Sequence, residues 1–107
     1  MSEPAYFVLA ALMPGPLHGY AIAKEVSKLG GGRFTLAVGT LYSVLDRLTH
    51  EAYVTVTGEE IVNGRARRYF ALTDAGRAAL EYEAERMAQA VRVVKLRSTG
   101  EVGASST

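Results

Sequence analysis

The sequence contains no cysteine and no tryptophan, and only two of its residues are histidines. The absence of cysteine excludes disulfides, zinc knuckles, iron–sulfur clusters and thiol catalysis. The two histidines, His18 and His50, are too few and too far apart in the chain to suggest a metal cage. We therefore expect neither a metal site nor a cofactor.

An excess of one charge is also missing, because 12 Lys and Arg stand against 11 Asp and Glu and leave a net charge of +1. A nucleic-acid site therefore has to show in where the charges lie, since bulk charge gives no indication of one. The longest uncharged stretch, residues 4–23, is broken by Pro14, Gly15 and Pro16 and cannot span a bilayer as one helix. The opening residues lack the basic segment of a signal peptide, and we expect no membrane partner.

What is present is a globular composition, with 49% hydrophobic and 21% charged residues over 107 positions. This length corresponds to one domain. A domain of this size buries only about 60–70% of the surface that its unfolded chain exposes, so its core is thin. We therefore expect that a partner subunit contributes to its stability.

Three helices are predicted in the first half of the chain, over residues 4–13, 18–29 and 39–51. Pro4 suits the first turn of the first helix, Pro14 ends it, and three glycines at residues 30–32 end the second. The third helix is the most clearly periodic, because one face carries Leu41, Val44, Leu45 and Leu48. Its opposite face carries Thr40, Ser43, Asp46, Arg47 and His50, with Tyr42 at the edge.

After Ala52 the period of the sequence changes from helical to alternating. Residues 53–57 and 68–72 are rich in β-branched and aromatic side chains and predict two strands. Asn63-Gly64 between them is the strongest short-range signal for a hairpin turn. Residues 33–36 predict a further short extended segment, and Thr73 is a good N-cap for a last helix.

The predicted last helix, residues 73–97, carries an apolar stripe with alternating steps of four and three: Leu80, Ala84, Met87, Val91 and Val94. Either the chain's own core or a second copy could cover this stripe. A long terminal helix on a thin domain has little within its own chain to cover it, so we favour dimerisation. From Ser98 to Thr107 the composition turns to small and polar residues, which predicts a flexible tail.

Three helices, a two-stranded hairpin and a final helix form the element order of a winged helix-turn-helix domain. The predicted fold is mainly α with a small β-hairpin: a winged helix-turn-helix over residues 1–72, with a dimerisation helix over 73–97 in the same compact unit. An exposed third helix could enter a DNA major groove, which is roughly 12 Å wide. The hairpin would add a second contact, because its tip places three arginines within four residues: Arg65, Arg67 and Arg68.

Four motifs then resemble, in order and spacing, those of the PadR family of transcriptional regulators. They are Pro16-Leu17-His18-Gly19-Tyr20, Gly39-Thr40-Leu41-Tyr42 followed by Leu45 and Arg47-Leu48, Asn63-Gly64-Arg65 with Arg67-Arg68-Tyr69-Phe70, and Leu72-Thr73-Asp74-Ala75-Gly76. The resemblance implies a bacterial, cytoplasmic repressor that dimerises through its N- and C-terminal helices and binds a palindromic operator in double-stranded DNA. In some members, a small-molecule effector at the dimer interface releases the operator.

The chain departs from the family pattern in two places. The family often has Ser-Pro before the Gly-Thr-Leu-Tyr motif, where this chain has Ala37-Val38. The change removes a hydroxyl N-cap and a proline suited to the first turn, a loss on the order of 1 kcal/mol, and we expect Gly39 to cap the helix instead. Some relatives also stack planar aromatic effectors on a tryptophan, which this chain lacks.

We expect DNA contacts from the third helix and the hairpin tip: Thr40, Tyr42, Ser43, Arg47, Asn63, Arg65, Arg67 and Arg68. We expect dimer contacts from the first and last helices: Val8, Leu12, Leu80, Ala84, Met87, Val91 and Val94. Plainer interpretations stand beside these. The arginines could form a solvated turn, Arg47 could pair with Asp46 or Glu51, and the polar residues of the third helix could serve only as surface.

His18 and Tyr20 have structural explanations first: His18 caps or braces the second helix, and Tyr20 packs on the core. A pH or metal switch through His18 is the alternative. No catalytic residue is expected, because no serine has a histidine and an acid at recognisable spacing and neither glycine cluster follows a strand. The rival function is a winged helix that binds a protein partner, but such modules usually lack a basic wing.

Overall fold

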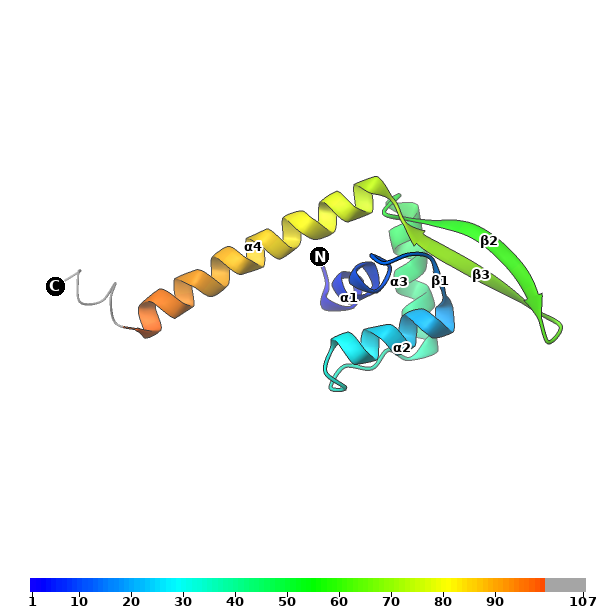
Figure 1. Ribbon diagram of the computed structural model, residues 1–107, viewed down its shortest axis with the longest axis horizontal. Coiled ribbons are helices and arrows are strands. Elements are labelled where there is room, and N and C mark those ends of the chain that lie inside the picture. The colour runs from blue at the N-terminus through cyan, green and yellow to red at the C-terminus, as the bar shows by residue number, and fades with distance from the viewer. Residues whose placement is uncertain (100–107) are drawn as a thin grey trace.

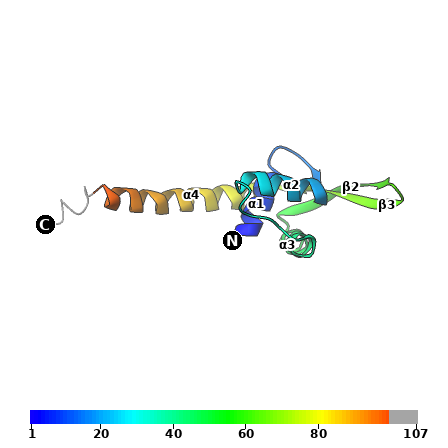
Figure 2. The ribbon, with the colours of Figure 1, turned by 90° about the horizontal axis from the view of Figure 1, so that it is seen from below.

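A computed structural model describes residues 1–99 as four helices and a three-stranded sheet. In chain order the elements are α1 (Glu3–Ala11), β1 (Leu17–His18), α2 (Gly19–Leu29), α3 (Val38–His50), β2 (Val54–Val62), β3 (Arg65–Leu72) and α4 (Asp74–Ser98). Helices α1, α2 and α3 lie in the middle of the molecule, and the β2–β3 hairpin and α4 extend from them in opposite directions (Figure 1, Figure 2). The predicted winged helix fold, mainly α with a hairpin and a long last helix, is confirmed.

Helix α1 is the centre of the hydrophobic core. Val8 and Leu9 of α1 and its C-cap Leu12 are fully buried and form one cluster with side chains from every other helix and from the sheet. The partners in this cluster include Ile22 and Val26 of α2, Leu41, Leu45 and Leu48 of α3, Val54 and Phe70 of the sheet, and Leu80 of α4. The apolar face predicted for the third helix is therefore the face that the core covers.

The burial of α1 corrects one prediction about dimerisation. Val8, Leu12 and Leu80 are at most 3% exposed within the single chain, so their side chains have no surface to offer a second copy. Helical spacing shows that a stripe has to be covered, but it does not say by which chain. In α4 the first turns of the stripe belong to the chain's own core, and only the later turns remain exposed.

The sheet has the antiparallel order β1–β3–β2. The hairpin strands are longer than predicted, and the third strand is the two-residue β1, which pairs Leu17 with Phe70, rather than residues 33–36. From Gly58 to Ile61 strand β2 is exposed on both faces, so this part of its sequence lacks the alternation that marks a half-buried strand. A two-residue strand leaves no periodic signal at all.

The hairpin turn follows the prediction closely. Asn63 and Gly64 both have positive φ, 52° and 76°, which is the backbone of a type I′ turn. The turn fixes a register in which Val62 lies opposite Arg65 and Glu60 opposite Arg67. A bulge between Val56 and Gly58 interrupts the ladder further from the tip.

Two predicted helix caps are confirmed, and a third is wrong. His18 caps α2, because its Nδ1 accepts from the Ala21 N–H at 3.3 Å, and Thr73 caps α4, because its Oγ1 accepts from the Gly76 N–H at 3.0 Å. Gly39, however, lies inside α3, and the N-cap is Ala37 with no side-chain hydrogen bond. The extended backbone of Ala37 is sufficient to start the helix, since its carbonyl accepts from the Leu41 N–H at 2.9 Å.

The end of α3 joins the hairpin and α4 at one point. Helix α3 ends in a Schellman motif, in which Ala52 has a positive φ of 65° and the Tyr53 N–H donates to the Leu48 carbonyl at 2.9 Å. The Thr73 hydroxyl donates to the Ala52 carbonyl at 2.7 Å, and the Thr73 N–H donates to the Tyr53 carbonyl at 3.1 Å. The start of α4 is therefore hydrogen-bonded directly to the turn after α3.

The rest of α4 leaves the body of the molecule. From Glu85 to Thr99 every residue is exposed. Nearer its start, the Arg77 guanidinium donates to the carbonyl of Met13, in the turn after α1, at 3.2 Å. Within residues 1–99, no helix combines the length and the apolar character needed to cross a membrane. Ser98 is the last residue of α4 and Thr99 its C-cap. The rest of the predicted tail, residues 100–107, lies outside the described residues.

Gly76 is the glycine on which the start of α4 depends. A Cβ at this position would overlap the Tyr53 carbonyl oxygen and lie 2.9 Å from Leu72 Cδ1. We expect Gly76→Ala to destabilise the protein by about 1–3 kcal/mol, because the backbone contact cannot relax without moving α4. Gly39→Ala is the control, since nothing lies within 4 Å of its added Cβ. Urea unfolding should give Gly39→Ala no loss, and equal losses in the two variants would contradict this packing.

Candidate nucleic-acid interface

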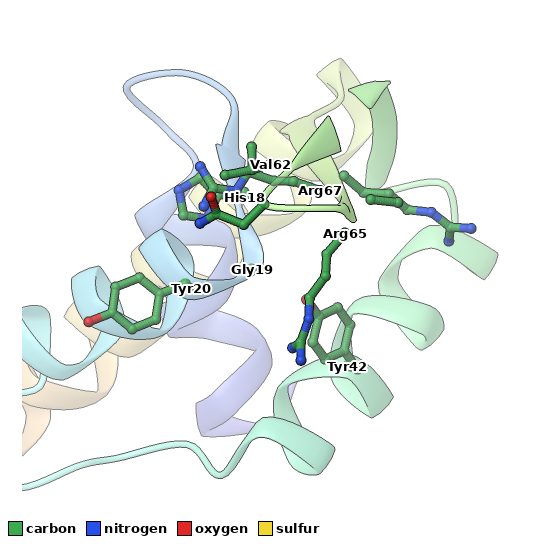
Figure 3. Close-up of a pocket in the computed structure, with 10 residues that line it drawn as sticks. His18, Gly19, Tyr20, Tyr42, Val62, Arg65 and Arg67 are labelled. Atoms are coloured by element: carbon green, nitrogen blue, oxygen red, sulfur yellow. The ribbon is translucent and has the colours of Figure 1, made fainter. Parts of the chain in front are cut away.

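A groove of about 580 Å³ separates the hairpin tip from α3 and from the start of α2. It is lined by His18, Gly19, Tyr20, Tyr42, Val62, Asn63, Arg65, Ala66, Arg67 and Arg68. The Arg65 side chain reaches from the hairpin toward Tyr42 of α3 (Figure 3). The structure thus brings together five of the eight residues predicted to contact DNA: Tyr42, Asn63, Arg65, Arg67 and Arg68.

The other three predicted contacts lie on a neighbouring surface. Thr40, Ser43 and Arg47 are exposed on α3 and line a separate hollow of about 370 Å³ between α3 and the start of α1. Within residues 1–99, Arg47 makes no ion pair with Asp46 or Glu51. The exposed face of α3 therefore carries a free guanidinium group beside two hydroxyl groups.

The wing arginines differ in their partners. Arg68 Nε lies 3.4 Å from Glu59 Oε2, and Arg67 Nη1 lies 3.9 Å from Glu60 Oε1, in both cases across the hairpin. Arg65 forms no ion pair with any of the described residues. The sequence prediction did not pair these arginines with the two glutamates, although counting outward from the Asn63-Gly64 turn places Glu59 and Glu60 opposite them.

Glu60 also holds the hydroxyl group of Tyr69. The Tyr69 hydroxyl donates to Glu60 Oε1 at 2.6 Å. This hydrogen bond raises the pKa of Tyr69 above its ordinary value of 10.0, and burial adds to the rise, while a hydrogen bond from Arg67 opposes it. Glu60 is thus shared between an arginine and a tyrosine of β3.

Tyr20 corrects another prediction, because it is 75% exposed and does not pack on the core. It lies two positions before the buried Ile22, which is about 200° around the helix and so points to the opposite side. Its ring stacks on His18, with centroids 6.4 Å apart and planes 9° apart, and His18 meets Tyr69 edge to face at 5.6 Å. An exposed tyrosine therefore stands at the edge of the groove.

Gly19 lets α2 and α3 meet at the bottom of the groove. A Cβ at this buried position would overlap the Tyr42 hydroxyl and lie 3.0 Å from Tyr42 Cζ. The glycine of the His-Gly-Tyr motif therefore makes room for the tyrosine of the Gly-Thr-Leu-Tyr motif. Within residues 1–99, no three His, Asp or Glu side chains gather as potential metal ligands.

The exposed part of α4 presents a second candidate surface. Ala84 is partly buried, and Met87, Val91 and Val94 are 37%, 50% and 63% exposed along one side of the helix. These four are the members of the predicted dimer stripe that keep accessible surface in the single chain.

The contact between Tyr69 and Glu60 predicts a pH dependence of the wing. Because the pKa of Tyr69 is raised in the folded chain, the stabilisation is fully present below about pH 10 and is lost as the pH rises through the raised pKa. Glu60→Gln removes the carboxylate and should lower the pKa of Tyr69 toward 10.0. NMR titration of tyrosine labelled at Cζ measures this pKa.

Glu59→Gln is the matched control for this titration, because Glu59 bonds to Arg68 and not to Tyr69. Glu59→Gln should change the pKa of Tyr69 much less than Glu60→Gln does. A Tyr69 pKa that is the same in all three proteins would contradict the hydrogen bond.

The exposed helix, the hairpin beside it and the groove between them define a winged helix-turn-helix protein. Residues 8–82 match the model of the family described as "Transcriptional regulator PadR-like family", and the chain belongs to this family. The family is described as one of transcriptional regulators, in agreement with the class of function predicted from the sequence.

Among curated proteins, the chain is 46% identical over 88 residues to an uncharacterized 37.1 kDa protein in transposon TN4556 of Streptomyces fradiae. The match covers 82% of this chain but 24% of that protein, so the chain spans about a quarter of its length. The chain is also 36% identical over 78 residues to the transcriptional regulator Rv3488 of Mycobacterium tuberculosis, covering 73% of this chain and 69% of the relative.

Solved structures share the fold. Bacillus subtilis PadR in complex with operator DNA is 26% identical with a TM-score of 0.66, and the match covers 75% of this chain and 45% of that one. A PadR family transcription regulator of Clostridium difficile has a TM-score of 0.74 at 23% identity, covering 88% of this chain and 96% of that one. The second match shows the fold alone.

Proposed function

We propose that the protein is a transcriptional repressor that binds an inverted-repeat operator in double-stranded DNA as a homodimer. The observation that carries the proposal is the basic groove in which Arg65 reaches from the wing toward Tyr42 on α3 (Figure 3). An exposed helix beside a free guanidinium group meets the two needs of DNA recognition, base-edge contact and phosphate contact. The operator complex of Bacillus subtilis PadR supports the proposal.

In this proposal the two surfaces contact different parts of the duplex. Helix α3 enters the major groove, roughly 12 Å wide, and offers Thr40, Ser43 and Arg47 to base edges. Arg65 and the other wing arginines lie on the other side of Tyr42 and contact phosphates or a narrow minor groove, for which arginine is well suited.

Selection of bound sites from random DNA tests the proposal. Two copies related by a two-fold axis should select an inverted repeat. Its half-site centres should lie about one helical turn apart, roughly 34–36 Å, or a multiple of that. Failure to retain any duplex DNA would favour the rival function, a winged helix that binds a protein.

Variants of the selected complex should separate the two surfaces. We expect Arg65→Ala to weaken operator and random DNA to a similar extent and to flatten the salt dependence by about one unit, because it removes a phosphate contact. Thr40, Ser43 and Arg47 replaced by alanine should cost the operator about 1–3 kcal/mol more than random DNA for each true base contact.

Arg97→Ala, at the far end of α4, is the control for charge loss away from the groove. Fluorescence anisotropy at several salt concentrations measures all these affinities. Equal losses on both DNAs for the α3 variants would reassign that face to backbone contact.

The homodimer is proposed because α4 carries its apolar stripe away from the body of the chain. Met87, Val91 and Val94 keep 37%, 50% and 63% of their surface exposed in the single chain, so a second α4 is the natural cover for them. Pairing two copies about a two-fold axis would also fix the distance between their two protein grooves, and so the spacing at which these grooves meet the DNA. The resemblance to PadR regulators suggests the same interface as the place for a small-molecule effector.

Charge reversal along the stripe tests the dimer. We expect Met87→Glu with Val91→Glu to give monomers, because two carboxylates would be buried without partners in the seam. Gln89→Glu with Val93→Glu adds the same charge on the other side of α4 and should leave the dimer intact. Light scattering at a protein concentration of about tens of micromolar measures the oligomeric state of both double variants and of the parent protein. A monomeric parent protein would overturn the proposal.

A further inference from the structure

The hairpin tip contains acidic side chains that can compete with DNA phosphate for its arginines. Between residues 59 and 68 there are three arginines and two glutamates, so this segment has a net charge of +1 rather than +3. Each glutamate lies directly opposite an arginine in the ladder, Glu59 opposite Arg68 and Glu60 opposite Arg67. Both pairs approach within ion-pair distance, at 3.4 and 3.9 Å.

We infer that Glu59 and Glu60 hold Arg68 and Arg67 in exchangeable ion pairs that limit the affinity of the wing for DNA of any sequence, and that Arg65 is the wing arginine free to bind phosphate first. This inference rests on the proposed DNA-binding function and assigns roles to residues within it. Glu59 and Glu60 are positioning residues, which act on DNA through the arginines they hold.

The geometry of the pairs makes them exchangeable. Each is joined by a single long contact and not by two parallel hydrogen bonds, and the four side chains are between 39% and 65% exposed. Exposed pairs of this kind are weak and screened by salt, so a phosphate can replace the carboxylate. The hydrogen bond from the Tyr69 hydroxyl keeps the Glu60 carboxylate beside Arg67 when DNA is absent.

The alternation of side chains along β3 sets the different role of Arg65. Arg65, Arg67 and Tyr69 are two residues apart and so share one face of the strand. On this face Glu60 contacts Arg67 and Tyr69, whereas the residue opposite Arg65 is the uncharged Val62. Arg65 therefore reaches into the groove without an acidic partner among the described residues.

The test uses the full chain and a random-sequence duplex of about 30 base pairs as the probe, with anisotropy read at salt between about 50 and 200 mM. We expect the double variant Glu59→Gln with Glu60→Gln to bind this DNA about tenfold more tightly and to steepen the salt slope by about one to two units, because two arginines are released to phosphate. Glutamine keeps an oxygen that can accept from the Tyr69 hydroxyl, and circular dichroism checks that the fold is retained.

The control is Glu81→Gln with Glu85→Gln, which makes the same change in net charge on α4, the element that extends away from the wing (Figure 1). It should change the affinity by less than about twofold. A second readout is specific to exchange: Arg67→Ala should cost little in the parent protein and markedly more in the double glutamine variant.

Equal tightening by both double variants, or no change in either, would overturn the role of the glutamates while leaving the proposed function intact. Absence of binding to duplex DNA by the parent protein and both variants at about 50 mM salt would overturn the proposed function, and this inference with it.

Discussion

The hydrogen bonds of Thr73 join helix α3, the hairpin and helix α4. The Thr73 hydroxyl donates to the Ala52 carbonyl at the end of α3 and accepts from the Gly76 N–H in the first turn of α4. The Thr73 backbone N–H, just after β3, donates to Tyr53 at the start of the wing. Helix α3, the hairpin and α4 therefore diverge from one hydrogen-bonded junction. Their relative directions are fixed there rather than by side chains at the groove, which is what a protein needs if two grooves are to meet DNA at a set spacing.

The core around α1 supports only part of this extended molecule. Helix α1 is nearly enclosed by the other helices, and α4 adds Leu80 to that core before it departs. Beyond Glu85 every residue that the structure describes is exposed, so this part of the helix buries little apolar surface against its own chain. Since isolated helices are marginal in water, the outer turns of α4 depend on a cover that a second copy would supply. The folding of that segment and the assembly of the proposed dimer are then one process.

Local chemistry in the sequence was sufficient to predict the fold class, the helices, the caps at His18 and Thr73 and the turn at Asn63-Gly64, because each depends on neighbours a few residues away. It was not sufficient for features set by distant parts of the chain. The two-residue β1 exists only because β3 is there to pair with it. The apolar stripe of α4 could not be divided between core and interface, since Leu80 and Val91 have the same spacing and differ only in what surrounds them. For the site, residue types predicted the basic tip and the exposed face of α3, while the exposure of Tyr20 required the assembled structure. The partners of Arg67 and Arg68 follow from the register that the Asn63-Gly64 turn sets, so the sequence contained the signal for them.

Which arginine is free is decided by backbone geometry and not by composition. The type I′ turn at Asn63-Gly64 sets the register that places Glu60 opposite Arg67 and Val62 opposite Arg65. Side chains alternate along a strand with a period of two, so a shift of the register by one residue would move the acidic partners to other positions and change the charge that each face presents. A turn with little charge of its own therefore controls the electrostatics of the wing. A chain with a net charge of +1 can in this way hold a surface for a polyanion, since the register of a few residues concentrates free positive charge where α3 meets the groove.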